Sequence, residues 1–288
     1  MKIVSPGNTV DIIKKYNLKL SKKYGQNFLI DENVLQKIIR AGELTGEDLV
    51  LEVGSGIGTL TQALVAESKK VVALEIDDHL IPVLKDYLKD YENLHLIHGD
   101  VLRVDLRRML PSLGDKKKWK VISNLPYNIT TPLIMKLLTD RDLFSLMVLM
   151  VQREVGERIT ASPGGKEYGA VTVLIEMFAS AEILFKVSPR VFIPPPEVES
   201  VVVRLKVREQ PLHPILEEEV FCQVVRGSFQ HRRKSLLNSL EASLKMNRQR
   251  LKTLIIQAGI DPARRGETLT AGEFANLSNI IYNNSKDI

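Results

Sequence analysis

Short runs of apolar residues alternate with amphipathic segments over the first two thirds of the chain. The apolar runs are typical of buried strands, which we predict at residues 49–53, 71–75, 94–97, 119–123 and 146–151. The segments between them carry apolar residues at helical spacing, which predicts helices at residues 59–67, 77–90 and 130–139. Strands that alternate with helices in this way form right-handed βαβ units. The pattern therefore predicts a Rossmann-like α/β fold, a mostly parallel sheet with helices on both faces.

The ends of the chain follow other patterns. Further elements are expected as helices at residues 9–17 and 31–41 and as a late strand at residues 200–207. Asp31 is placed to be the N-cap of the second helix. Residues 171–184 fit either a buried helix or a strand, and the chain after the late strand is patterned as helix. We therefore expect two domains, an α/β domain over residues 1–207 and a small all-α domain over residues 208–288.

Composition excludes several classes of protein. The chain has 288 residues, of which 44% are hydrophobic and 26% charged, as in a globular protein. The longest apolar stretch, residues 143–151, is shorter than the ~20 residues that cross a bilayer. The first twenty residues lack the apolar core of a secretion signal, so we expect a cytoplasmic protein. The single cysteine, Cys222, excludes an internal disulfide, and the histidines lack the spacing of metal ligands.

Positive charge is concentrated in two segments. Residues 226–252 contain eight lysines and arginines against one acid, Glu241. The other segment, near the N-terminus, holds Lys14, Lys15, Lys19, Lys22 and Lys23. A charged run is often only a solvated face, but two such runs favour a polyanionic partner. For the first segment we predict contacts to the phosphates of such a partner, made by Arg226, Arg232, Arg233 and Lys234.

Four candidate ligand-binding positions directly follow predicted strands. They are a glycine-rich turn beginning at Gly54, then Glu75, Asp100 and Asn124. The steps between them are 21, 25 and 24 residues, each the length of one strand-plus-helix unit. Ligands of an open parallel sheet bind beyond the carboxyl ends of the strands. We therefore expect all four positions at one ligand-binding edge of the sheet.

The residue types at this edge indicate a nucleoside-containing cofactor. A glycine turn lets the backbone approach a ligand, although such a turn can also be only a tight connection. Glu75 can accept from both hydroxyls of a ribose, and Asp100 can accept from the amine of an adenine. The dinucleotide fingerprint requires a third glycine where Thr59 stands, although Gly58 is adjacent. We therefore predict S-adenosylmethionine, with a nicotinamide dinucleotide as the less favoured alternative.

The four residues Asn124, Leu125, Pro126 and Tyr127 suggest the chemistry. Methyl transfer to a base amine requires acceptors for its two N–H groups, because its lone pair is delocalised into the ring. The Asn124 side-chain oxygen and a backbone carbonyl held by Pro126 would favour a pyramidal nitrogen that faces the methyl donor. Tyr127 would offer a stacking surface for an unstacked base. The alternative is an ordinary loop with a proline turn.

These motifs resemble those of the ribosomal RNA adenine N6-dimethyltransferases, and specifically the branch that modifies two adjacent adenosines in a hairpin loop of 16S rRNA. The resemblance extends from Lys22 to about Leu277. The matching strings are residues 24–29 (YGQNFL), 52–58 (EVGSGIG), 124–130 (NLPYNIT), 192–200 (FIPPPEVES), 229–238 (FQHRRKSLLN) and 259–262 (GIDP). Two departures are Ser55, where the branch often has proline, and Thr130, where serine is common.

The resemblance implies a class I methyltransferase domain and assigns residues to it. The implied cofactor contacts are Asn27, Leu29, Gly54, Glu75, Asp100 and Asn124. Asn124 with the backbone of Leu125 and Pro126 would hold the adenine amine, and Tyr127 and Phe192 would flank the base. The implied partner is 16S rRNA in the 30S subunit or its precursor, and we expect a monomer without a metal ion.

Two alternative functions remain open from the sequence. One is the related branch that methylates large-subunit rRNA and confers antibiotic resistance, whose members tend to have isoleucine where Leu125 stands. The other is a ribosome assembly factor that has kept the fold without activity. The intact motif at residues 124–127 favours an active enzyme.

Overall fold

The protein forms two compact units in the computed structural model, which describes residues 2–19, 25–113, 117–231 and 233–285. The α/β unit consists of Met1–Gly156 and Glu182–Val207. The helical unit consists of Glu157–Ala181 and Arg208–Ile288. One division between the two units falls after Val207. The segment Glu157–Ala181, which we expected in the first domain, belongs instead to the helical unit.

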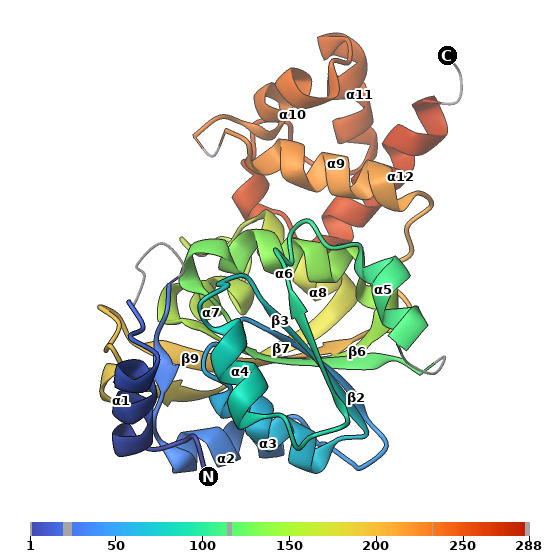
Figure 1. Ribbon diagram of the computed structural model, residues 1–288. Coiled ribbons are helices and arrows are strands. Elements are labelled where there is room, and N and C mark those ends of the chain that lie inside the picture. The colour runs from blue at the N-terminus through green and yellow to red at the C-terminus, as the bar shows by residue number, and fades with distance from the viewer. Residues whose placement is uncertain (1, 20–24, 114–116, 232, 286–288) are drawn as a thin grey trace. The chain divides into compact units, whose positions relative to one another are not determined.

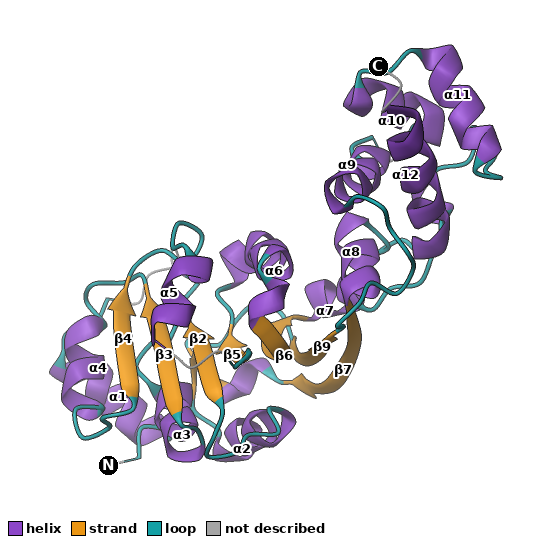
Figure 2. Ribbon diagram, turned by 90° about the vertical axis from the view of Figure 1, so that its right-hand side faces the viewer, coloured by secondary structure: helices purple, strands orange, loops and turns teal. Residues whose placement is uncertain are grey.

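A seven-stranded sheet with the order β4-β3-β2-β5-β6-β9-β7 forms the framework of the α/β unit (Figure 2). Its strands are β2 (Leu49–Val53), β3 (Lys70–Glu75), β4 (Leu94–His98), β5 (Trp119–Asn124), β6 (Phe144–Gln152), β7 (Ala179–Val187) and β9 (Ser200–Val207). The pairs from β4 through β6 are parallel, and β9 runs antiparallel to β6. Because β2 lies between β3 and β5, the strand order reverses there, which is where open sheets bind ligands.

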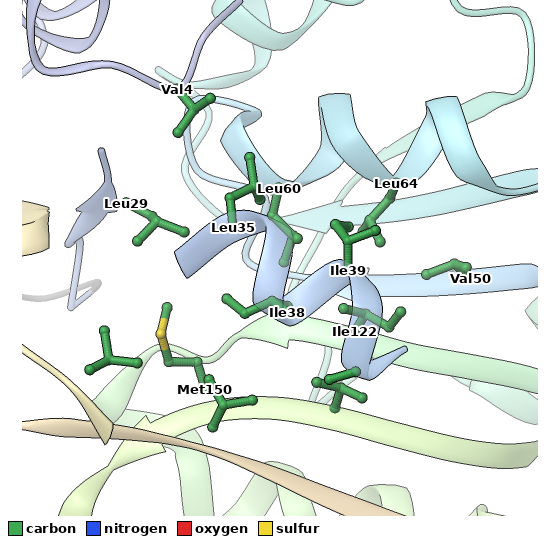
Figure 3. Close-up of a cluster of buried hydrophobic side chains, with 14 of the residues drawn as sticks. Val4, Leu29, Leu35, Ile38, Ile39, Val50, Leu60, Leu64, Ile122 and Met150 are labelled. Carbon is green, nitrogen blue, oxygen red and sulfur yellow. The ribbon is translucent and has the colours of Figure 1, made fainter. Parts of the chain in front are cut away.

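Helices cover both faces of this sheet (Figure 1). The helices that begin in the α/β unit are α1 (Pro6–Lys15), α2 (Glu32–Ala41), α3 (Thr59–Glu67), α4 (Ile81–Tyr87), α5 (Leu106–Leu113), α6 (Thr130–Thr139) and α7 (Arg153–Ile159). Every residue of β2 is buried, which requires cover on both sides. On one side, Ile38 of α2 and Leu64 of α3 pack with Val50, Ile122 and other strand residues (Figure 3).

Local sequence signals explain most helix ends. The Asp31 side chain accepts a hydrogen bond from the backbone N–H of Val34 at 2.9 Å, as predicted for an N-cap. The helices at residues 59–67 and 130–139 have the predicted bounds. The helix predicted at residues 77–90 is shorter, because Asp77 caps a separate turn and Pro82 lies in the first turn of α4.

Aromatic contacts hold the helical unit together. Its helices are α8 (Ala170–Phe178), α9 (Glu218–Phe229), α10 (Leu236–Leu244), α11 (Arg248–Gln257) and α12 (Ala271–Ser285). The Phe178 and Phe221 rings meet edge to face at 6.0 Å, and the Tyr168 and Phe229 rings meet at the same distance. These contacts explain why residues 157–181 belong to this unit. The ambiguous stretch at residues 171–184 contains both a helix, α8, and the start of β7.

Short elements complete the chain. A two-stranded antiparallel sheet joins β1 (Phe28–Leu29) to β8 (Phe192–Ile193). The 3-10 turns are Tyr127–Ile129, Arg141–Leu143, Pro189–Val191 and Gly266–Thr268. Within the described ranges, no helix has both the length and the apolar character needed to span a membrane.

Candidate active site

An open cavity lies at the carboxyl ends of β2, β3 and β5 in the α/β unit. It encloses about 930 Å³ of empty space when the open solvent at its mouth is counted. The wall includes all the predicted cofactor contacts, namely Asn27, Leu29, Gly54, Glu75, Asp100 and Asn124. Leu125, Pro126 and Tyr127 line it as well. The four strand-end positions, from Gly54 to Asn124, therefore meet at one site, as the strand-end argument predicts, and Asn27 lines the same cavity.

The glycine turn approaches its neighbours too closely for side chains. Gly54, Gly56 and Gly58 all have positive φ, at 73°, 59° and 92°. A Cβ on Gly54 would lie 3.1 Å from Pro126, and one on Gly56 would lie 3.3 Å from the Phe28 ring. The backbone thus forms a bare wall of the cavity, pressed against the segment that carries Asn27 and against the Pro126 loop.

We expect Gly56→Ala to lower the free energy of unfolding by about 1–2 kcal/mol from the left-handed backbone alone, and further because the Phe28 ring must move. Chemical denaturation without ligand measures this change. Gly164→Ala is the matched control, because Gly164 also has positive φ (82°) but a Cβ there would meet nothing within 4 Å. Equal losses in the two variants would show that the contact with Phe28 has no energetic consequence.

Backbone donors fix the Glu75 carboxylate at the wall. Oε2 accepts from the N–H of Gly56 at 2.8 Å, and Oε1 accepts from the N–H groups of Ile76 and Asp77 at 3.0 and 2.9 Å. The side chain is almost fully buried, and this burial raises its pKa, although the backbone donors oppose the rise. The result is an oriented acceptor beside the cavity, as required to bind ribose hydroxyls.

Asp100 is the more exposed of the two acids. Its Oδ1 accepts from the N–H of Leu102 at 2.9 Å, and its Oδ2 lies 3.6 Å from Nε of Arg103. Ile76 and Val101, the residues that follow Glu75 and Asp100, line the cavity with apolar side chains. The sequence analysis missed these two residues, which together could cover the faces of a planar base. Their positions directly after the strand-end acids were the available signal.

The Asn124 side chain is tied to the N-terminal segment. Its Nδ2 donates to the backbone carbonyl of Asn27 at 3.1 Å, and no described residue donates to its Oδ1. The next residue, Leu125, donates its N–H to the carbonyl of Met150 in β6 at 3.0 Å. The amide is therefore held from one side, with its acceptor oxygen left for a ligand.

Tyr127 is positioned by β9. Its hydroxyl lies 2.6 Å from Oγ of the fully buried Ser200, and burial raises the pKa of the phenol. The ring therefore serves as a neutral, fixed apolar surface.

The structure does not bring Phe192 to the cavity wall. This residue pairs with Leu29 in the β1–β8 sheet, and its side chain is 2% exposed. It packs in the same core cluster as Leu29 and Met150. The ring is therefore buried in the core and is not part of the cavity wall in this conformation.

The helical unit carries exposed cations without acidic partners. Arg226, Arg233 and Lys234 are exposed, and none of them forms an ion pair with a described residue. Arg232 lies outside the described residues. By contrast, Arg248 pairs with Glu241, and Arg264 with Glu273. Exposed cations without an acidic partner among the described residues therefore lie at the end of α9 and in the loop that follows it, with Lys245 and Lys252 as further examples in this unit.

The fold and the cavity together define a Rossmann-like methyltransferase. A sequence profile described as "Ribosomal RNA adenine dimethylase" matches residues 17–283. The chain belongs to this family.

Its relatives match over nearly their whole length. The "Ribosomal RNA small subunit methyltransferase A" of Clostridium botulinum is 46% identical over 275 residues, which cover 96% of this chain and 98% of the relative. The protein of the same name from Geobacillus kaustophilus is 44% identical over 283 residues, with 97% of each chain covered.

Two solved structures share the fold. A dimethyladenosine transferase from Plasmodium falciparum superposes with a TM-score of 0.71 at 28% identity, covering 91% of this chain and 98% of the other. The 23S rRNA methyltransferase ErmE superposes with a TM-score of 0.65 at 24% identity, covering 89% and 100%, and shares the fold.

Proposed function

We propose that the protein transfers methyl groups from S-adenosylmethionine to N6 of two adjacent adenosines in a hairpin loop near the 3′ end of 16S rRNA, during biogenesis of the small ribosomal subunit. The main observation that supports the proposal is that Glu75, Asp100 and Asn124 line one cavity. The near full-length match to small-subunit methyltransferases supports the choice of rRNA.

The cavity residues fit this cofactor. Glu75 would accept from the ribose hydroxyls, Asp100 from the adenine amine, and Ile76 and Val101 would contact the base. Three buried polar atoms along the wall, Glu52 Oε2, Ser55 Oγ and Thr59 Oγ1, have no hydrogen-bond partner among the described residues, as expected where a polar ligand belongs. When bound, the cofactor supplies an electrophilic methyl group.

The chain's contribution to the reaction is positioning. The Asn124 Oδ1 atom and a backbone carbonyl of the Leu125–Pro126 segment would accept from the two N–H groups of the target amine and expose its lone pair. Tyr127 would stack on the base. Phe192, which is buried in the core, could flank the base only after a side-chain movement. No strong general base is required, since the methylated nitrogen can lose its proton to water.

The helical unit would position the RNA. Phosphate contacts fix the register of a protein on RNA, and base contacts specify the target. Arg226, Arg233 and Lys234 are exposed and uncompensated, so they are suited to phosphates, with Arg232 expected to join them. We propose that the protein acts on the 30S subunit or its precursor, in the cytoplasm and as a monomer.

Replacing Arg226, Arg233 and Lys234 together by alanine is expected to weaken binding to 30S subunits. Each lost phosphate contact on a duplex should also reduce the steepness of the slope of log affinity against log salt concentration by ~0.9. The measurement is 30S affinity at several salt concentrations. Affinity for S-adenosylmethionine should not change, because its cavity lies within the α/β unit.

Lys118→Ala provides the control for loss of charge. This exposed lysine precedes β5, at the opposite end of the strand from Asn124. It should leave the salt slope unchanged. An unchanged salt slope in the triple variant would show that Arg226, Arg233 and Lys234 are only exposed to solvent and do not contact RNA. RNA contacts would then have to be sought among Lys14, Lys15 and Lys19.

Methyl transfer to 30S subunits that lack these methyl groups tests the proposed function directly. We expect labelled methyl groups in 16S rRNA and a primer-extension stop at two adjacent adenosines. Methylation of 23S rRNA instead would favour the large-subunit activity. Binding to 30S subunits without any methyl transfer would favour a non-catalytic assembly factor.

A further inference from the structure

The segment at residues 25–29 forms part of the cavity wall and is held at three places. The Asn27 carbonyl accepts from the side chain of Asn124, and the strand that follows pairs with β8. The third contact is a hydrogen bond from the amide Nε2 of Gln26 to Oδ2 of Asp77, at 2.5 Å. This bond joins the segment to the turn after β3, and it has no role in the function described so far.

Asp77 is a buried acid whose two oxygens serve different parts of the chain. Its side chain is 5% exposed. Oδ1 accepts from the backbone N–H of His79 at 3.0 Å and lies 3.0 Å from Nδ1 of the same residue, as in a turn closed by an aspartate. Oδ2 accepts from Gln26, which is 51 residues away in the sequence. Because the turn needs only Oδ1, the contact with Gln26 is not explained by local structure.

Asp77 connects the two functional ends of the cavity. Its backbone N–H donates to Oε1 of Glu75 at 2.9 Å. Its side chain holds Gln26, and the next residue, Asn27, accepts the hydrogen bond that orients Asn124. A continuous series of contacts therefore runs from the proposed ribose acceptor to the proposed acceptor for the target amine.

We propose, on the basis of the function proposed above, that Asp77 is a positioning residue for methyl transfer. It holds Gln26, and this keeps the Asn27 carbonyl at the place where it orients the Asn124 amide. Asp77 is not part of the cavity wall that the described residues form, so it acts through the segment 25–29 and not on the ligand itself. Without this contact the Gln26 amide loses an acceptor, and the segment is held at one place fewer.

Gln26→Glu breaks the contact while Asp77 keeps its bonds to His79. Two acids would then face each other and repel, so the segment would move away from the turn after β3. We expect single-turnover methyl transfer at saturating S-adenosylmethionine to fall about tenfold, the scale of one hydrogen bond. Saturation with the cofactor separates this effect from any change in cofactor affinity. A rate equal to that of the wild type would exclude the positioning role.

Combining Gln26→Glu with Asp77→Asn restores the contact with donor and acceptor exchanged. The amide nitrogen introduced at position 77 would donate to the acid introduced at position 26, and the amide oxygen would still accept from His79. The rate of the double variant should return to within a few-fold of the wild type. If the double variant is as slow as Gln26→Glu, the hydrogen bond is not the cause of the loss and the proposal is wrong.

A second comparison tests whether Asp77 acts through Asn124. In the Asn124→Asp variant the Asn27 carbonyl has no amide to orient, so the position of the segment should matter little. Gln26→Glu should therefore slow the wild type about tenfold but the Asn124→Asp variant less than about twofold, since substitutions that act through one contact are not additive. Equal slowing in the two backgrounds would show that the effect does not pass through Asn124.

Gln36→Glu is the matched control. Gln36 of α2 also donates its amide to an acid, Oε1 of Glu32 at 3.1 Å, but it lies outside the cavity wall. This variant should transfer methyl groups at the rate of the wild type. All rates are compared at a temperature where thermal unfolding shows every variant to be folded.

The proposed function and this inference fail in different ways. Methyl transfer to 30S subunits that is insensitive to Gln26→Glu overturns the role of Asp77 alone. Absence of methyl transfer by the wild type overturns the proposed function and this inference with it.

Discussion

Replacing Asn124 by aspartate is expected to slow single-turnover methyl transfer by about 10²–10³-fold, the scale of losing one oriented transition-state contact. The amide Nδ2 donates to the carbonyl of Asn27. An aspartate has no donor for that carbonyl, so two oxygens would repel each other and the side chain would turn. The acceptor for the target amine would then be displaced, although the shape of the side chain is almost unchanged.

Cofactor affinity should fall far less in this variant, by no more than a few-fold, because the acceptors for ribose and adenine lie on other strands. Single-turnover rates and calorimetric affinities of the same preparation give the comparison. Asn238→Asp, the same change at an exposed position of α10, should alter neither quantity. A rate within a few-fold of the wild type would exclude Asn124 as the residue that holds the amine.

Replacing Glu75 by alanine is expected to weaken binding of S-adenosylmethionine by about 2–3 kcal/mol, as for loss of charged hydrogen bonds. The structure adds a second expectation. The N–H groups of Gly56, Ile76 and Asp77 would lose their acceptor, so the free energy of unfolding without cofactor should fall as well.

The two effects are separated by measuring affinity calorimetrically at a temperature where the variant is fully folded. Asp78→Ala is the matched control, because this exposed acid lies three residues further along without contributing to the cavity wall. It should leave affinity unchanged. Unchanged affinity in Glu75→Ala would exclude Glu75 as the ribose acceptor.

Local patterns predicted the elements of the α/β unit well, because each strand or helix carries its own periodicity. The strand at residues 200–207 has the predicted bounds. Its antiparallel position beside β6 could not be predicted, since pairing depends on contacts between distant residues. The same limit explains why the sequence pattern did not group residues 157–181 with the helical unit. The rings of Phe178 and Phe221 meet in space, although 43 residues separate them.

The candidate site was predicted where it follows strand ends and missed where it does not. Glu75, Asp100 and Asn124 each end or follow a strand, and all three line the cavity. Glu52 lies inside a strand, so the strand-end argument passed over it. An acid within the apolar run of residues 49–53 was nevertheless a signal, because a fully buried strand rarely contains one. The inward position of Phe192 depends on its pairing with Leu29, which no local pattern contains.

The hydrogen bond from Gly56 to Glu75 also limits when the site can form during protein synthesis. The turn after β2 is completed by a carboxylate at the end of β3, 19 residues later in the chain. A growing polypeptide cannot close this turn until the segment through Glu75 has left the ribosome and β3 has paired with β2. The first βαβ unit is therefore the smallest nascent fragment in which the ribose side of the cavity can exist. The adenine side must wait for Asp100, and the half that holds the target base must wait for Asn124.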